Sequence, residues 1–188
     1  MFWRACRETA VNAPLPASIE GTQVVLRPFV ESDITPAYLG WLNDPVTTRY
    51  SNQRFRSHSR ATSLRYLASF EGTQNLFLAV RRRADGSPLG TMTAYVAEEH
   101  GTADIGILIG ERACWGQGYG LDAWQALMRW LLTERGLRKV TAGTLDCNLP
   151  MRRLAEHSGM HEEGARRRQE IVDGREHDIL LFARFRDA

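Results

Sequence analysis

Apolar residues recur along this chain with two periodicities, one typical of strands and one typical of helices, and the clearest change between them lies near the middle of the chain. Residues 104–109 form a short apolar, β-branched run, which is typical of a strand buried on both faces. From residue 121 onward, apolar side chains recur at the i, i+3 and i+7 spacing of a helix with one buried face, at Leu121, Trp124, Leu127, Met128 and Leu131. Between the two lie Gly116, Gly118 and Gly120. The pattern therefore predicts a unit of strand, glycine loop and helix.

The same patterns predict short elements on both sides of this unit. Strands are expected at residues 23–30, 75–82, 89–97 and 140–145, and Asp173-Gly174 marks a two-residue hairpin turn between two further strands. Helices are expected to start at a Ser32/Asp33 cap, near Pro45 (a short one through Tyr50), near Leu64 with Gly72 after its end, and at an Asn148 cap. Residues 1–22 show no periodicity, so we expect a tail or an arm lying on another surface. Residues 23–188 would then form a single domain.

Composition narrows the class of protein without naming a function. The 188 residues are 43% hydrophobic and 24% charged, as in an ordinary soluble domain. The net charge of +2 is too small to indicate nucleic-acid binding. No apolar run approaches the roughly 20 residues that span a membrane, so no membrane association is expected. The first residues also lack the apolar segment of a signal peptide.

The cysteines and histidines predict neither disulfides nor a metal site. Cys6, Cys114 and Cys147 make an odd number without a CxxC pair, which fits a reducing, cytoplasmic setting. None of the five histidines forms HExxH or another ligand spacing, so no metal is expected.

The glycine loop favours an anionic ligand, because a helix that opens on glycines offers unpaired N–H groups and the positive end of its dipole. A nucleotide triphosphatase loop would end in Lys-Ser/Thr, which Gly120-Leu121-Asp122 does not supply. A dinucleotide fingerprint, G-x-G-x-x-A, is satisfied by residues 118–123, and Asp146 ends the next predicted strand. However, that fold needs further parallel strand–helix units, and here one helix and an antiparallel hairpin follow Asn148.

A third possibility is coenzyme A. Residues 115–120 resemble the pyrophosphate loop of the GNAT acetyltransferase superfamily, Gln/Arg-x-x-Gly-x-Gly/Ala. Trp115 stands at the Gln/Arg position, a departure often seen in the branch that includes the ribosomal-protein alanine N-acetyltransferases. The resemblance runs from about Val24 to Phe185 and includes four further segments: residues 26–29 with Asp33, 41–46, 148–160 and 177–181.

The resemblance implies an α/β fold with a mixed, mostly antiparallel central sheet, flanked by helices and splayed to admit coenzyme A. It implies acetyl-CoA as co-substrate, with the pyrophosphate on the loop amides, pantetheine on the preceding strand, and contacts from the Asn148 side chain and an arginine. The residues implied are Leu108, Ile109, Trp115, Gly116, Gln117, Gly118, Tyr119, Gly120, Leu121, Asn148 and Arg153. Asn148 also serves as a helix cap, and the two roles are compatible.

Attack of an amine on a thioester calls for a base, since an alkyl amine with a pKa of about 10 is mostly protonated at neutral pH. Family precedent puts a carboxylate on or beside the central strand, so Asp104 and Glu111 lead as candidates, each with an alternative as an ordinary surface acid. Many relatives carry a Tyr as general acid where Ala155 stands here. Cys147 is better interpreted as a bystander than as a nucleophile.

The acceptor is expected opposite, beside Trp41, Asn43, Asp44 and Tyr50, although helix packing and turn capping explain these residues equally well. We therefore expect an N-acetyltransferase acting on a small primary amine, such as an amino sugar. The alternatives are an N-terminal protein acetyltransferase of the ribosomal type and a non-catalytic CoA-binding sensor. Family habit would allow a homodimer.

Overall fold

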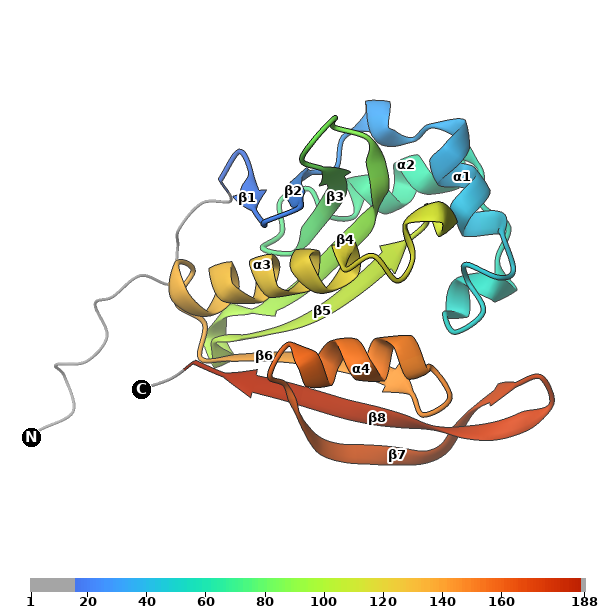
Figure 1. Ribbon diagram of the computed structural model, residues 1–188, viewed down its shortest axis with the longest axis vertical. Helices are drawn as coiled ribbons and strands as arrows, with labels where there is room; N and C mark the ends of the chain where they lie inside the picture. Colours follow the sequence, from blue (N-terminus) through green and yellow to red (C-terminus); the bar gives the residue numbers. More distant parts are fainter. Residues whose placement is uncertain (1–15, 187–188) are drawn as a thin grey trace, which may run out of the picture.

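The computed structural model describes residues 16–186, in which eight strands form one sheet (Figure 1). The strands are β1 (Ile19–Glu20), β2 (Val24–Pro28), β3 (Leu76–Arg82), β4 (Pro88–Ala97), β5 (Thr102–Ile109), β6 (Lys139–Leu145), β7 (His161–Val172) and β8 (Arg175–Phe185). Their order is β1-β2-β3-β4-β5-β6-β8-β7, and neighbours are antiparallel except for the parallel pair β5 and β6. The predicted mixed, mostly antiparallel sheet is thus confirmed.

Four helices cover the sheet: α1 (Pro36–Asn43), α2 (Arg60–Ala68), α3 (Tyr119–Thr133) and α4 (Leu149–His157). On one face, α3 buries Trp124, Leu127 and Leu131 completely, and α4 packs beside it through Ala155. On the other face, α1 and α2 enclose an aromatic cluster in which the Phe29 and Phe77 rings lie 4.3 Å apart. The helical spacing read from the sequence therefore places α3 in the main core.

Four local expectations are wrong, each for a physical reason. Thr35 rather than Ser32/Asp33 caps α1, because the Asp33 carboxylate is already occupied by Arg27 and Arg81. Residues 45–50 form turns, not a helix, since the side chain of Asp44 binds the N–H groups of the next residues.

The other two wrong expectations concern the end of helix α2 and the burial of strand β5. Helix α2 stops at Ala68 and is followed by turns up to Gly72, whose φ is +68°. Strand β5 is not buried on both faces, because Asp104 is exposed and residues 106–109 are only half-buried. Asp104 lies on the face of the strand that is open to solvent, whereas Ala103 and Ile105 on either side of it point to the buried face.

The sheet divides between β5 and β6. These strands pair at three positions only, Thr102 with Lys139, Ala103 with Val140 and Asp104 with Thr141. Each strand then continues on its outer neighbour: β4 pairs with β5 as far as Ile109, and β8 pairs with β6 as far as Leu145. The backbone groups of each arm that face its outer neighbour are hydrogen-bonded, so the gap stays open without breaking either half of the sheet, and the groups that face the gap have no strand partner.

Two glycines hold the free end of β5 against its neighbours. A Cβ at Gly90 would lie 1.9 Å from the carbonyl oxygen of Leu108, so β4 approaches β5 there more closely than any side chain allows. A Cβ at Gly110 would lie 2.1 Å from the indole of Trp41 in α1. The end of β5 is therefore fixed from both the sheet and the helix layer.

The described part of the expected N-terminal arm joins the sheet. Strand β1 pairs with β2, and Ile19 is buried in the main core. The carboxylate of Asp122, in the first turn of α3, accepts hydrogen bonds from the N–H groups of Thr22, Gln23 and Val24 at 2.9, 2.7 and 3.0 Å. Residues 1–15 of the expected arm lie outside the described residues.

We predict that Asp122→Ala lowers the free energy of unfolding by about 2–3 kcal/mol, since three N–H groups lose a charged acceptor. Urea unfolding measures the effect. Glu156→Ala, at an exposed position in α4, serves as the matched control and should change stability by less than about 0.5 kcal/mol. Equal stability of the two variants would contradict the role assigned to Asp122.

Candidate functional site

The loop between β5 and α3 leaves a row of backbone donors without protein partners. Gly116 and Gly118 have φ values of +73° and +87°, and Gly118 is the N-cap of α3 without any side-chain cap. Among residues 16–186, no protein acceptor bonds to the N–H groups of residues 117–121. These donors, at the positive end of a 15-residue helix, suit a phosphate or pyrophosphate.

The loop is tied to the open end of β5. The indole Nε1 of Trp115 donates to the carbonyl of Ile109 at 2.8 Å, and Nε2 of Gln117 donates to the carbonyl of Ala113 at 2.6 Å. A Cβ at Gly120 would lie 3.5 Å from Ile109 and 3.6 Å from Leu154 of α4. The loop therefore lies beside the gap between the two arms of the sheet.

The residues expected to contact pantetheine border the gap. Leu108 and Ile109 are half-buried at the end of β5. Asn148, also half-buried, caps α4 by accepting a hydrogen bond from the N–H of Met151 at 3.4 Å. Of the two arginines considered, Arg153 is exposed on α4, whereas Arg152 turns inward and donates to the carbonyl of Asp146 at 3.1 Å.

The two candidate bases lie far apart. Asp104 stands at the last paired position between β5 and β6, and the hydroxyl of Thr141 donates to its carboxylate at 2.9 Å. Glu111 lies beyond the other end of β5, roughly 20 Å away at about 3.3 Å per residue. There its carboxylate accepts a hydrogen bond from the N–H of Ala113 and caps a short 3-10 turn, Arg112–Cys114.

The pKa of the Asp104 carboxyl is raised. Although the residue is exposed on its face of the sheet, partial desolvation of the carboxylate raises its pKa above the ordinary value, and the hydrogen bond from Thr141 only partly offsets this. A carboxyl with a raised pKa at the point where the sheet divides has the chemistry of a general base.

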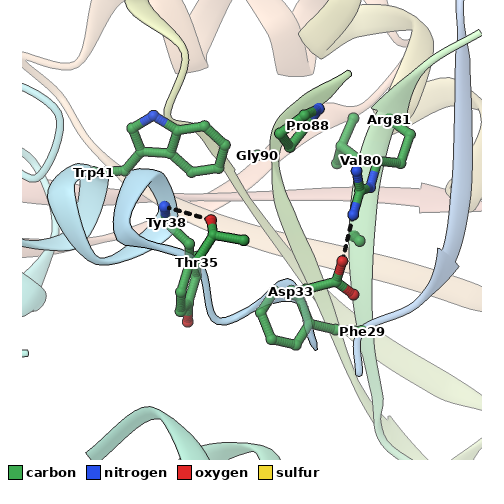
Figure 2. A pocket seen from close by; sticks show the side chains of 10 residues that line it. Phe29, Asp33, Thr35, Tyr38, Trp41, Val80, Arg81, Pro88 and Gly90 are labelled. Carbon is green, nitrogen blue, oxygen red and sulfur yellow. Dashed lines mark hydrogen bonds and ion pairs between the residues drawn. The ribbon is translucent and has the colours of Figure 1, made fainter. Parts of the chain in front are cut away.

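Of the four residues expected to contact the acceptor, Trp41 is packed against the end of β5, and Asn43 and Asp44 form side-chain hydrogen bonds to nearby backbone groups. Trp41 packs against Gly110 and lines a cavity of about 40 Å³ beside Tyr38 and Asp33 (Figure 2). This cavity has room for a few water molecules and none for a coenzyme or a sugar. The side-chain amide of Asn43 donates hydrogen bonds to the carbonyl groups of Leu39 and His58, and its oxygen accepts one from the N–H of His58.

Asp44 and Tyr50 complete this set. The carboxylate of Asp44 accepts hydrogen bonds from the hydroxyl and N–H of Thr47, and chiefly the hydroxyl bond lowers its pKa. Tyr50 is half-buried beneath the guanidinium of Arg49, 5.4 Å from the ring centroid. Within residues 16–186, neither Tyr50 nor Trp41 forms a side-chain hydrogen bond, so both are free to contact a ligand.

A bridge that the sequence did not predict connects residues 49–54 to the tip of the β7–β8 hairpin. Arg49 pairs with Asp173 at 2.7 Å, and Asn52 donates to Glu170 at 3.1 Å. Arg54 lies 3.6 Å from Glu170 and donates to the carbonyl of Ile171 at 3.2 Å. Because the partners are more than 100 residues apart in sequence, no local pattern could have indicated them.

A second group that the sequence missed lies at the end of β6. Nδ1 of His177 is 2.7 Å from the carboxylate of Asp146, and Cys147 lies beside both. Burial, followed by the negative charge of Asp146, raises the pKa of the Cys147 thiol. Asp146 and Cys147 adjoin Asn148, so this group borders the same gap.

A sheet that opens between two parallel strands, with a glycine-opened helix beside the gap, is the architecture of an acyltransferase that uses a diphosphate-bearing thioester. Comparison with known proteins agrees. The sequence matches the acetyltransferase (GNAT) domain family over residues 23–161. It is 30% identical over 146 residues to the uncharacterized N-acetyltransferase p20 of Bacillus licheniformis, covering 75% of this chain and 81% of that protein. The chain therefore belongs to the GNAT family and is an acyltransferase.

Solved structures share the fold. One is RimL, the ribosomal L7/L12 alpha-N-protein acetyltransferase, in complex with coenzyme A, with a TM-score of 0.77 and 19% identity over 89% of this chain and 97% of that chain. Another is the ribosomal-protein-S5-alanine acetyltransferase of Vibrio fischeri, with a TM-score of 0.74 and 18% identity over 92% and 98%. The predicted resemblance to this branch is thus confirmed at the level of the fold.

We predict that Gly118→Val weakens coenzyme A binding at least about 10-fold, because a branched side chain at φ +87° displaces the loop N–H groups. Calorimetry with coenzyme A measures the change. Gly174→Val imposes the same backbone strain at the hairpin tip, where φ is +76° and no atom lies within 4 Å, and should leave affinity unchanged. Unaltered affinity in the Gly118 variant would remove the loop from the binding site.

Proposed function

We propose that this acetyltransferase moves the acetyl group of acetyl-CoA to the primary amine of a small molecule, such as an amino sugar, by direct attack. The proposal rests on one observation: the gap between β5 and β6 has free backbone donors at its open end and a carboxylate of raised pKa where it closes. A ligand with a diphosphate at one end and a reactive carbonyl at the other fits that arrangement.

The residues present suit acetyl-CoA. The N–H groups of residues 117–121 would bind the pyrophosphate, and the glycines leave no Cβ in the way. Backbone groups of Leu108 and Ile109 would line the pantetheine path, and one N–H there would polarise the acetyl carbonyl. When bound, the thioester supplies an activated acetyl group.

Asp104 would act as the base, directly or through water. As the amine nitrogen bonds to the acetyl carbon and the C–S bond breaks, Asp104 takes the N–H proton. Its raised pKa makes the transfer more favourable than for an ordinary carboxylate. Ala155, where many relatives carry a Tyr, is fully buried, so α4 offers no acid at that position. A thiol pKa of about 8.5 makes thiolate a tolerable leaving group without one.

The bridge between residues 49–54 and the hairpin supports a compact acceptor. Arg54 and Glu170 are only 14% and 21% exposed, so their ion pair is a firm link between two segments that border the acceptor side. A small amine fits beneath such a link more readily than the end of a folded protein. The competing proposal, a protein N-terminus as acceptor, draws on the fold shared with two ribosomal-protein acetyltransferases.

Thiol release from acetyl-CoA decides between these acceptors. The panel contains simple amines, amino sugars and short peptides with free amino termini. Turnover with amino sugars or other small amines and none with peptides is the expected result. Turnover confined to peptides would overturn the acceptor class, and tight coenzyme A binding without turnover on any amine would indicate a sensor.

We predict that Asp104→Asn lowers kcat by about 10²- to 10⁴-fold, the usual contribution of a general base, with little change in coenzyme A affinity. The hydrogen bond from Thr141 is retained because the amide oxygen still accepts it. Glu111→Gln is the matched variant, and its kcat should stay within about threefold of the parent. If the Glu111 variant loses activity and the Asp104 variant does not, the base has been assigned to the wrong carboxylate.

The same Asp104 variant should be more stable than the parent at neutral pH. The folded chain favours the protonated carboxyl because its pKa is raised, so ionisation costs stability as the pH rises from about 3.9 through the folded value. Asparagine mimics the protonated form and removes this cost. Thermal unfolding should show a higher Tm for the variant at pH 7 and a smaller difference near pH 4; a lower Tm at pH 7 would contradict the desolvation argument.

We predict that Arg54→Gln raises KM for the acceptor about 10-fold, as expected for the loss of one hydrogen-bonded charge pair, while coenzyme A affinity is unchanged. Steady-state kinetics with the best acceptor of the panel measures the effect. Arg65→Gln, on an exposed position of α2, is the control. An unchanged KM would show that the bridge does not shape the acceptor site.

A further inference from the structure

Asp146, Cys147 and His177 form a group of potential metal ligands. Among the residues that the structure describes, it is the one group of at least three such side chains whose ligand atoms all lie within 4.8 Å of one another. The side chains of His177 and Asp146 are 21% and 37% exposed, so a solvated ion can reach them. The residues come from two segments about 30 positions apart, which is why no ligand spacing appeared in the sequence.

The backbone beneath this group is held from several sides. The N–H of Asp146 donates to the carbonyl of Asp178 on β8 at 2.9 Å, and Arg152 donates to the carbonyl of Asp146. The N–H of Asn148 donates to the carbonyl of Leu145 at 3.0 Å. The three side chains therefore project from a fixed turn and a paired strand, which lowers the entropy lost when they converge on an ion.

The chemistry of the donors indicates a soft divalent transition-metal ion. Thiolate, imidazole and carboxylate are the ligands of zinc, and three protein ligands with water in a fourth position form an open zinc site. Bond lengths of about 2.0–2.3 Å place tetrahedral ligand atoms about 3.4–3.6 Å apart. The carboxylate and Nδ1 would open from 2.7 Å and the more distant donors would close from at most 4.8 Å, which side-chain rotations achieve.

A nucleophilic Cys-His-Asp triad is the competing interpretation of the same residues. Such a triad activates its cysteine with a neighbouring cation. Here a carboxylate lies beside the thiol, and the nearby guanidinium of Arg49 is paired with Asp173. A divalent cation between the donors would neutralise the carboxylate and stabilise the thiolate together.

His177 lies on the same face of the sheet as Asp104. Asp104 pairs with Thr141 on β6, and Leu145 pairs with Ile179 on β8, so alternation along the strands puts Asp104 and His177 on one face. About 13 Å of β6 separates Thr141 from Leu145, and His177 lies two residues farther along β8. The group is therefore separate from the candidate base and close to the open end of the gap.

We propose that Asp146, Cys147 and His177 bind zinc or a similar soft divalent transition-metal ion beside the open end of the gap. Binding releases the thiol proton, because cysteine coordinates zinc as the thiolate. The binding does not rest on the proposed function. The proposal replaces the expectation, drawn from ligand spacing alone, that the chain holds no metal.

Cobalt(II) titration of the full-length, reduced protein tests the binding. Coordination should give the visible bands of a tetrahedral cobalt site and a thiolate-to-cobalt charge-transfer band, and zinc should displace both. Cys147→Ser should abolish the charge-transfer band, and His177→Asn and Asp146→Asn should each weaken binding at least about 10-fold. His100→Asn, at an exposed position elsewhere, is the control and should bind as the parent does.

The spectra of the parent and of the Cys147 variant decide the proposal. A folded protein without the charge-transfer band, or a Cys147 variant that keeps it, would overturn the metal site. If no amine supports turnover, the proposed function fails while the spectroscopic result still decides whether the metal site exists.

Discussion

The structure depends on how the backbone hydrogen bonds of β5 and β6 are shared. The two strands bond to each other over three residue pairs and then each bonds only to an outer neighbour, so a sheet that buries a continuous core still opens along one seam. Each arm keeps the bonds to its outer neighbour, while the groups that face the seam have no strand partner beyond those three pairs. The seam has room to open for a long ligand without local unfolding, and the glycine loop, Asp104 and Asn148 border it.

The two ends of this seam have opposite electrostatic character. At the open end, helix α3 begins on glycines and presents N–H groups to solvent. At the closed end, Asp104 is held between strands, and desolvation opposes its ionisation. A ligand with a diphosphate and a carbonyl separated by a flexible arm would be oriented by this difference alone, since only one of its ends is attracted to the glycine loop.

The sequence predicted the elements whose stabilising contacts are local. The spacing of Trp124, Leu127 and Leu131 predicted α3, and Asp173-Gly174, with φ values of +49° and +76°, predicted the β7–β8 hairpin. It failed where distant residues compete for the same side chain: Asp33 pairs with Arg27 and Arg81 and so does not cap α1. The bridge through Arg54 and the group around His177 join segments that no periodicity relates.

The turn between strands β1 and β2 is hydrogen-bonded to the start of helix α3, directly after the glycine loop. Asp122 lies in the first turn of α3, which follows the glycine loop, and its carboxylate accepts hydrogen bonds from the β1–β2 turn. The side chain of Gln23 lies 3.3 Å from the position that a Cβ on Gly118 would occupy. A displacement of the β1–β2 turn would therefore act directly on the first turn of α3 and on the glycine loop that precedes it.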